Sequence, residues 1–113
     1  MNKCNFTKKQ DKKMIRHIVM FKLKEFATPA DKQAKMQEIK TKLEALSGKI
    51  DVLRMIRVDF NVNPAETWDI LLTTELDTLK DVDIYANHPE HVAVAKGIIG
   101  PVKADRACVD YEV

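Results

Sequence analysis

The sequence predicts a single α+β domain with the ferredoxin-like order strand, helix, strand, strand, helix, strand, in which helices cover one face of a four-stranded antiparallel sheet. Three observations lead to this prediction. Four segments alternate apolar and polar residues with period two, as strands do. Two regions repeat apolar residues at intervals of three or four, as helices do. A chain of 113 residues has room for one such domain and not for two.

The predicted strands follow from the alternation. The first strand begins at Ile15, and its alternate residues form one side that is expected to be fully covered: Ile15, His17, Val19, Phe21 and Leu23. The second and third strands are expected at about 50–61 and 67–76, and the last at about 106–113. In the last strand the alternating set is Ala107, Val109, Tyr111 and Val113.

The first helix is predicted to begin after Thr28, because a hydroxyl can cap the helix and Pro29 suits the first helical position. Its apolar residues are Met36, Ile39, Leu43 and Leu46, and Ser47-Gly48 is a typical end.

The second helical region is predicted to begin at Asp77-Thr78, which cap a short helix that holds Leu79, Val82 and Tyr85. Asn87-His88-Pro89 interrupts it, because a residue before proline avoids the helical conformation. Pro89 can then start a further helix, which Gly100-Pro101 ends. One face of that helix carries His91, Val94, Ala95 and Ile98.

The composition limits the class of protein. Hydrophobic residues make up 45% of the chain and charged residues 32%, which is typical of a soluble globular domain. The formal net charge of +2 gives no reason to expect a nucleic acid or an anionic membrane as partner. Residues 1–13 are polar and lysine-rich and contain no apolar segment of a signal peptide, so we expect a disordered tail before a domain at 14–113. No apolar run is long enough to span a membrane, and we expect a cytoplasmic protein.

The sequence contains no recognisable cofactor or metal motif. Cys4 and Cys108 lie near opposite ends of the chain, outside any C-x-x-C pair, and we expect reduced thiols and no metal site. The three glycines form no phosphate-binding loop, and we expect no cofactor.

The second face of the sheet is also predicted to be apolar. We expect residues from all four strands to point away from the helices: Ile18, Met20, Leu53, Met55, Leu71 and Cys108. A monomer would expose this band to water, whereas two sheets packed face to face would cover it. The sequence therefore predicts a homodimer formed through the open sheet face, a dimeric α/β barrel.

Three segments carry a family resemblance. Residues 17–24, HIVMFKLK, resemble the opening strand of the stress-responsive dimeric α/β-barrel (Dabb) family. Residues 85–92, YANHPEHV, resemble its Y-x-x-H-P-x-H signature, and residues 107–113, ACVDYEV, resemble its last strand. The resemblance covers about residues 14–113 and implies the same fold and an intimate dimer.

The functions in this family are diverse, and the resemblance therefore implies a fold more strongly than a reaction. Some plant members are stress-induced, very stable proteins, and one, olivetolic acid cyclase, closes a polyketide ring by an aldol reaction. The similarity to this cyclase implies that His17, Tyr85 and His91 are pocket residues. Another pocket histidine of the cyclase falls at Ile70, which cannot carry protons, so we expect a different substrate.

The candidate site combines His17, Tyr85 and His91. Both histidines lie on apolar sides of their elements, and the break before Pro89 can bring Tyr85 against His91. Such a group suits proton transfer beside a carbonyl, with His91 as base and Tyr85 as orienting group or donor to the oxygen. We expect His17, Phe21, Ile70 and His88 to contact a ligand.

Three functions remain open at this point. The first is a dimer of unassigned role that binds a small hydrophobic ligand between sheet and helices. The second is a cyclase-like enzyme that uses a His/Tyr pair, and the third is a non-catalytic structural stress protein. In the last case the histidines and Tyr85 are hydrogen-bonded core residues, and His88 caps the helix after the break.

Overall fold

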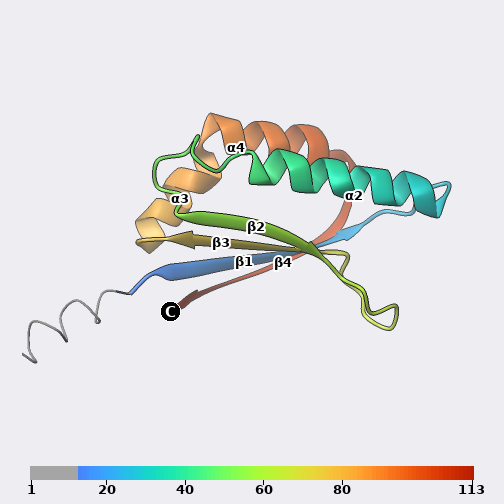
Figure 1. Cartoon of the computed structure of the whole chain (residues 1–113), viewed down its shortest axis with the longest axis horizontal. Helices are drawn as coiled ribbons and strands as arrows, with labels where there is room; N and C mark the ends of the chain where they lie inside the picture. The colour runs from blue at the N-terminus through green and yellow to red at the C-terminus, as the bar shows by residue number, and fades with distance from the viewer. Residues whose placement is uncertain (1–12) are drawn as a thin grey trace, which may run out of the picture.

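The computed structural model describes residues 13–113 and contains a four-stranded antiparallel sheet with all its helices on one face (Figure 1). The strands lie in the order β2-β3-β1-β4. The elements in chain order are β1 (Ile15–Leu23), α2 (Pro29–Glu44), β2 (Met55–Phe60), β3 (Ile70–Leu76), α3 (Leu79–Asn87), α4 (Pro89–Val94) and β4 (Lys103–Glu112). This arrangement confirms the predicted ferredoxin-like fold.

Strand β1 lies inside the sheet and pairs along its length with both β3 and β4. Its burial alternates as the sequence predicts. The side chains that face the helices are the buried set Ile15, His17, Val19, Phe21 and Leu23. These residues form the floor on which the helices pack.

Helix α2 covers the β2 side of this floor. The Thr28 hydroxyl accepts a hydrogen bond from the Asp31 N–H at 3.1 Å, as expected for an N-cap. Met36, Ile39 and Leu43 are buried, and Leu46 is buried in the turn after the helix. Gly48 has φ of +81°, a conformation that glycine adopts without steric cost.

Two side chains of α2 bind the backbone of the edge strand β2. Glu44 accepts a hydrogen bond from the Val58 N–H at 3.0 Å, and Lys40 donates to the Val58 carbonyl at 2.6 Å. Lys40 and Glu44 also form an ion pair one helical turn apart. These contacts fix the helix against the sheet and satisfy two groups of an otherwise unpaired edge.

The second and third strands in chain order, β2 and β3, are shorter than the sequence predicts. Residues 50–54 form turns and coil, and β3 begins at Ile70. The predicted position of Leu53 on the open face is therefore wrong: Leu53 belongs to the buried core, with 8% of its surface exposed. Leu53 lies outside any strand, so period-two alternation does not determine where it points.

The predicted orientation of Cys108 is also wrong. Cys108 is paired with Val19 across the β1–β4 ladder, and directly paired residues share a face, so Cys108 lies on the helix side. Val109 and Tyr111 lie on the open face with Ile18, Met20 and Leu71. Val109 is 55% exposed and Tyr111 42% exposed, so the chain alone leaves this face open to water.

The second helical region contains the predicted break. Thr78 caps α3 by accepting from the Asp81 N–H, and Val82 and Tyr85 are buried as expected. Leu79 is the first residue of α3 and is 59% exposed. Helix α4 begins at Pro89 and continues through a π-helical turn at Ala95–Ile99 and a 3-10 turn at Gly100–Val102.

No helix within residues 13–113 is long and apolar enough to cross a membrane. The predicted disordered tail, residues 1–13, lies outside the described residues except for Lys13. Cys4 also lies outside them.

Candidate functional site

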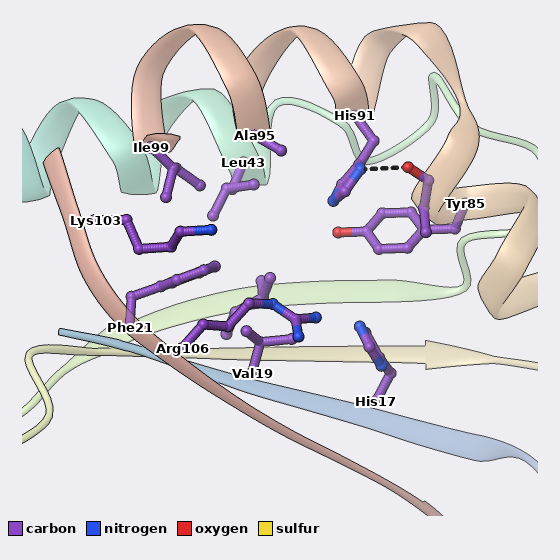
Figure 2. A pocket seen from close by; sticks show the side chains of 12 residues that line it. His17, Val19, Phe21, Leu43, Tyr85, His91, Ala95, Ile99, Lys103 and Arg106 are labelled. Carbon is purple, nitrogen blue, oxygen red and sulfur yellow. Dashed lines mark hydrogen bonds between the residues drawn. The ribbon is translucent and has the colours of Figure 1, made fainter. Parts of the chain in front are cut away.

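A cavity of about 120 Å³ lies between the sheet and the helices (Figure 2). Its walls are mainly apolar and include Val19, Phe21, Leu43, Leu72 and Ile99. For comparison, an apolar cavity of about 150 Å³ in another protein binds benzene. The cavity is therefore of a size that suits a small molecule with a few carbon atoms.

The π-helical turn forms part of the roof of the cavity. The Gly100 N–H donates to the Ala95 carbonyl five residues earlier, and Ala95 and Ile99 both face the cavity. A side chain at position 100 would place Cβ only 3.3 Å from the Ala95 carbonyl oxygen. Such turns widen a helix and occur frequently at functional sites.

Tyr85 and His91 meet across the Asn87–Pro89 break. Their ring centroids are 4.5 Å apart, and the ring of His17 lies 6.2 Å from that of Tyr85. The His91 Nδ1 lies 2.9 Å from the Ala86 carbonyl oxygen. A carbonyl oxygen only accepts, so Nδ1 carries the proton and the neutral ring keeps a free lone pair on Nε2. In Figure 2 the second ring nitrogen of His91 and the Tyr85 hydroxyl point into the same space.

His17 is oriented by a carboxylate on the neighbouring strand. Its Nδ1 lies 2.5 Å from Oδ1 of Asp110. The two residues are direct partners in the β1–β4 ladder. The carboxylate accepts this hydrogen bond, so Nδ1 of His17 carries a proton. Only 9% of the His17 side chain is exposed, and the ring forms one wall of the cavity.

The hydroxyl of Tyr85 has no hydrogen-bond partner among residues 13–113, although Tyr85 is only 1% exposed. Burial raises the pKa of this phenol, so the oxygen stays protonated and remains a donor. A buried donor without an acceptor is rare in native structures.

The electrostatic surroundings keep His91 neutral. Desolvation by burial lowers the pKa of His91, and electrostatic interactions with His17, Arg106 and His88 act in the same direction. The hydrogen bond to Ala86 opposes this change and does not overcome it. His91 therefore enters the neutral pH range as an unprotonated base.

Four of the six predicted site residues meet at the cavity: His17, Phe21, Tyr85 and His91. Ile70 is buried in the core and does not line the cavity. His88 lies outside it, because its Nδ1 accepts a hydrogen bond from the Glu90 N–H at 3.1 Å and caps α4. The contacts of His88 are therefore those of the alternative interpretation, in which it caps the helix after the break.

Three polar residues of β4 near the cavity were not predicted from the sequence. Lys103 and Arg106 line the cavity, and Asp110 holds His17. Alternation along β4 contained part of this information, because Arg106 and Asp110 lie opposite the apolar set that starts at Ala107. The sequence does not give the register of β4 against β1. This register places Arg106 beside Phe21 and Asp110 beside His17.

His17, Cys108 and Asp110 offer donor atoms that all lie within 4.8 Å of one another. This group could in principle hold a metal ion. Burial raises the pKa of the Cys108 thiol, which opposes formation of the thiolate, and the charge of Arg106 only partly offsets this effect. Arg106 would also repel a bound cation, so the surroundings favour a hydrogen-bonded cluster.

The fold and the cavity define a class: small α+β domains that combine a ferredoxin-like sheet with an internal pocket under the helices. Residues 15–113 match the stress responsive A/B barrel domain, and the chain belongs to this Dabb family. The resemblance found in the sequence is thereby confirmed.

Solved structures agree with this assignment. A dimeric protein of unknown function with a ferredoxin-like fold from Bacteroides fragilis is 50% identical, with a TM-score of 0.82, over 88% of this chain and 96% of that chain. A dimeric ferredoxin-like protein of unknown function from Thermobifida fusca is 27% identical, with a TM-score of 0.75, over 91% and 93%. A hydroxynitrile lyase from Passiflora edulis shares the fold at 15% identity, with a TM-score of 0.72, over 88% and 93%. No curated protein matches the chain.

The lowered pKa of His91 gives a prediction about pH. In NMR titration of the ring protons, His91 should have a midpoint below 6.5, its ordinary value. The unfolded chain then binds the proton more readily than the folded chain, so this group's contribution to the free energy of unfolding decreases as pH falls below about 6.5. Urea denaturation should therefore show that the free energy of unfolding falls less between pH 7 and pH 5 in His91→Gln than in the unchanged protein. A midpoint at or above the ordinary value would contradict this account.

Proposed function

We propose that the protein binds a small, mostly apolar molecule with a hydrogen-bond-accepting oxygen in the cavity between sheet and helices. The observation that carries this proposal is the buried, unpartnered hydroxyl of Tyr85. A buried donor that is left unsatisfied costs about 1–3 kcal/mol, and phenylalanine at the same place would avoid this cost. A ligand oxygen in the cavity would supply the missing acceptor.

The cavity walls favour the same kind of ligand. The side chains of Val19, Phe21, Leu43, Leu72 and Ile99 offer an apolar surface. Polar groups occur at a few defined places, which is typical of small-molecule sites. The cavity volume of about 120 Å³ restricts the ligand to roughly the size of a six-membered ring.

The Tyr85 hydroxyl can be tested with cyclohexanone and with methylenecyclohexane, which has a similar shape and no oxygen. We expect the full chain to prefer cyclohexanone in an NMR titration. Tyr85→Phe should reduce this preference by about tenfold, because one hydrogen bond is lost. The melting temperature should stay unchanged or rise, because the variant no longer buries an unpartnered hydroxyl.

Tyr111→Phe is the matched control, because Tyr111 lies on the other face of the sheet and does not line the cavity. It should bind both probes as the unchanged protein does. If neither probe binds the unchanged protein, the proposed ligand site fails and the structural role becomes the better account. A large fall in melting temperature in Tyr85→Phe would also contradict the proposal, because the hydroxyl would then stabilise the fold.

Proton-transfer catalysis is a second candidate function, favoured by the His91–Tyr85 pair. Neutral His91 has its lone pair on Nε2, beside a phenol that remains a donor. In a bound ketone, Nε2 would take a proton from the carbon next to the carbonyl, while the Tyr85 hydroxyl stabilises the enolate oxygen. The Passiflora edulis hydroxynitrile lyase is an enzyme with the same fold. This is consistent with chemistry on such a scaffold, and it assigns no reaction to this chain.

Exchange of the ring protons next to the carbonyl of cyclohexanone in D₂O tests the catalytic candidate. Exchange should be faster with the protein than in buffer, and His91→Gln should lose about a hundredfold of this acceleration. The melting temperature of the variant at pH 7 serves as the control for folding. Binding of cyclohexanone without any acceleration would leave the binding function and eliminate this catalytic one.

We also propose that the chain forms a homodimer through the open sheet face. The proteins from Bacteroides fragilis and Thermobifida fusca are described as dimeric. In this chain the open face carries exposed apolar side chains, among them Leu71, Val109 and Tyr111. A second copy would remove them from water. A cytoplasmic location, and the absence of nucleic-acid and membrane partners, stay predictions from the sequence.

The dimer interface can be tested by sedimentation equilibrium. Val109→Lys should convert the dimer to a monomer, because it would bury a lysine in the interface without a partner. Val62→Lys makes the same chemical change at a loop residue that is 92% exposed, and it should leave the dimer intact. A monomeric unchanged protein, or a dimer that survives Val109→Lys, would argue against this interface.

A further inference from the structure

Two cationic side chains, Lys103 and Arg106, line the same cavity as Tyr85 and His91. In Figure 2 the ends of both side chains point into the cavity from β4, whereas Tyr85 and His91 enter from the helices. We propose that the ligand is a small carboxylate anion, bound by Lys103 and Arg106 and by the Tyr85 hydroxyl. This inference rests on the ligand-binding function proposed above and specifies the class of ligand.

A β-bulge directs both cations to one face of the sheet. Residues 103 and 106 are three apart, and in a regular strand such residues lie on opposite faces. Here the register shifts: Phe21 pairs with Arg106, Lys22 with Asp105, and Leu23 with Lys103. Position 104 is therefore left out of the pairing. Because Phe21 and Leu23 both face the helices, their two partners do so as well. Bulges that redirect side chains are frequent beside binding sites.

Neither positive charge is neutralised by an ion pair in the part of the chain that the structure describes. No carboxylate within residues 13–113 forms an ion pair with the side chain of Lys103 or Arg106. The guanidinium does interact with Cys108, which is a neutral thiol when protonated. The residues that line the cavity include no aspartate or glutamate. Asp110, which lies close by, already accepts a hydrogen bond from His17.

A carboxylate matches this set of donors. It has two oxygens and about four lone-pair sites, so it can accept from a guanidinium and from a phenol at the same time. Arginine binds planar carboxylates through two parallel N–H donors. The apolar walls suit a short hydrocarbon part and do not suit the strongly hydrated phosphate ion. The Tyr85 hydroxyl, which lacks an acceptor, would find one in the bound anion.

Isobutyrate and isobutyramide have the same shape and differ in charge, and they separate the carboxylate inference from ligand binding in general. In low salt the full chain should bind isobutyrate about tenfold more tightly than isobutyramide in an NMR titration, because hydrogen bonds to a charged group are the stronger ones. The double variant Lys103→Gln/Arg106→Gln should lose this preference and should still bind cyclohexanone. Lys80→Gln/Lys96→Gln removes the same charge from exposed helical positions that do not line the cavity, and it should keep the preference.

The outcomes distinguish failure of the carboxylate inference from failure of ligand binding in general. The carboxylate inference would be overturned if isobutyrate and isobutyramide bound equally well, or if the preference survived in Lys103→Gln/Arg106→Gln. In either case, binding of cyclohexanone would still support the proposal that the cavity binds a small ligand. If the unchanged protein binds none of the three compounds, both fail. Inorganic phosphate should not displace isobutyrate at equal concentration, and displacement would overturn the assignment of a carboxylate.

Discussion

Strand β1 is the constraint on which the rest of the structure depends. Because β1 pairs with β3 on one side and β4 on the other, its alternation fixes which face of both neighbours meets the helices. A slip of one residue in either ladder would move a whole row of side chains to the other face. The core, the cavity wall at His17 and the apolar open face all follow from this one register.

The cavity combines features that oppose stability with features that suit a ligand. Tyr85 is buried with an unpartnered hydroxyl, and burial keeps His91 neutral at the cost of its hydration. A core optimised only for stability would use apolar groups at such positions. Proteins retain unfavourable local arrangements of this kind mainly at functional sites, where the missing interactions are made with another molecule.

Much of the fold could be predicted from the sequence because its signals are local. The period of β1, the Thr28 cap and the Pro89 break each depend on residues close in the chain, and the structure contains all three. The same break allowed the contact between Tyr85 and His91 to be anticipated. Leu53 was misplaced because a short turn follows none of the strand periodicity that surrounds it.

The candidate site was only partly predictable, because part of it depends on long-range pairing. Asp110 lies 93 residues from His17 in the chain, and only the β1–β4 register brings them together. Cys108 was assigned to the wrong face for the same reason. His88 resembled a site residue in its sequence context, but its ring is used locally as a helix cap.

The bulge at position 104 has a consequence for how related chains diversify. The unpaired residue sets the phase of everything N-terminal to it in β4. Loss of residue 104 would continue β4 as a regular strand, with Lys103 two places from Arg106 and still opposite Leu23. A related chain can therefore lose the extra residue at the sheet margin and keep both cations on the cavity side, so the charge of the cavity does not depend on this irregularity being retained.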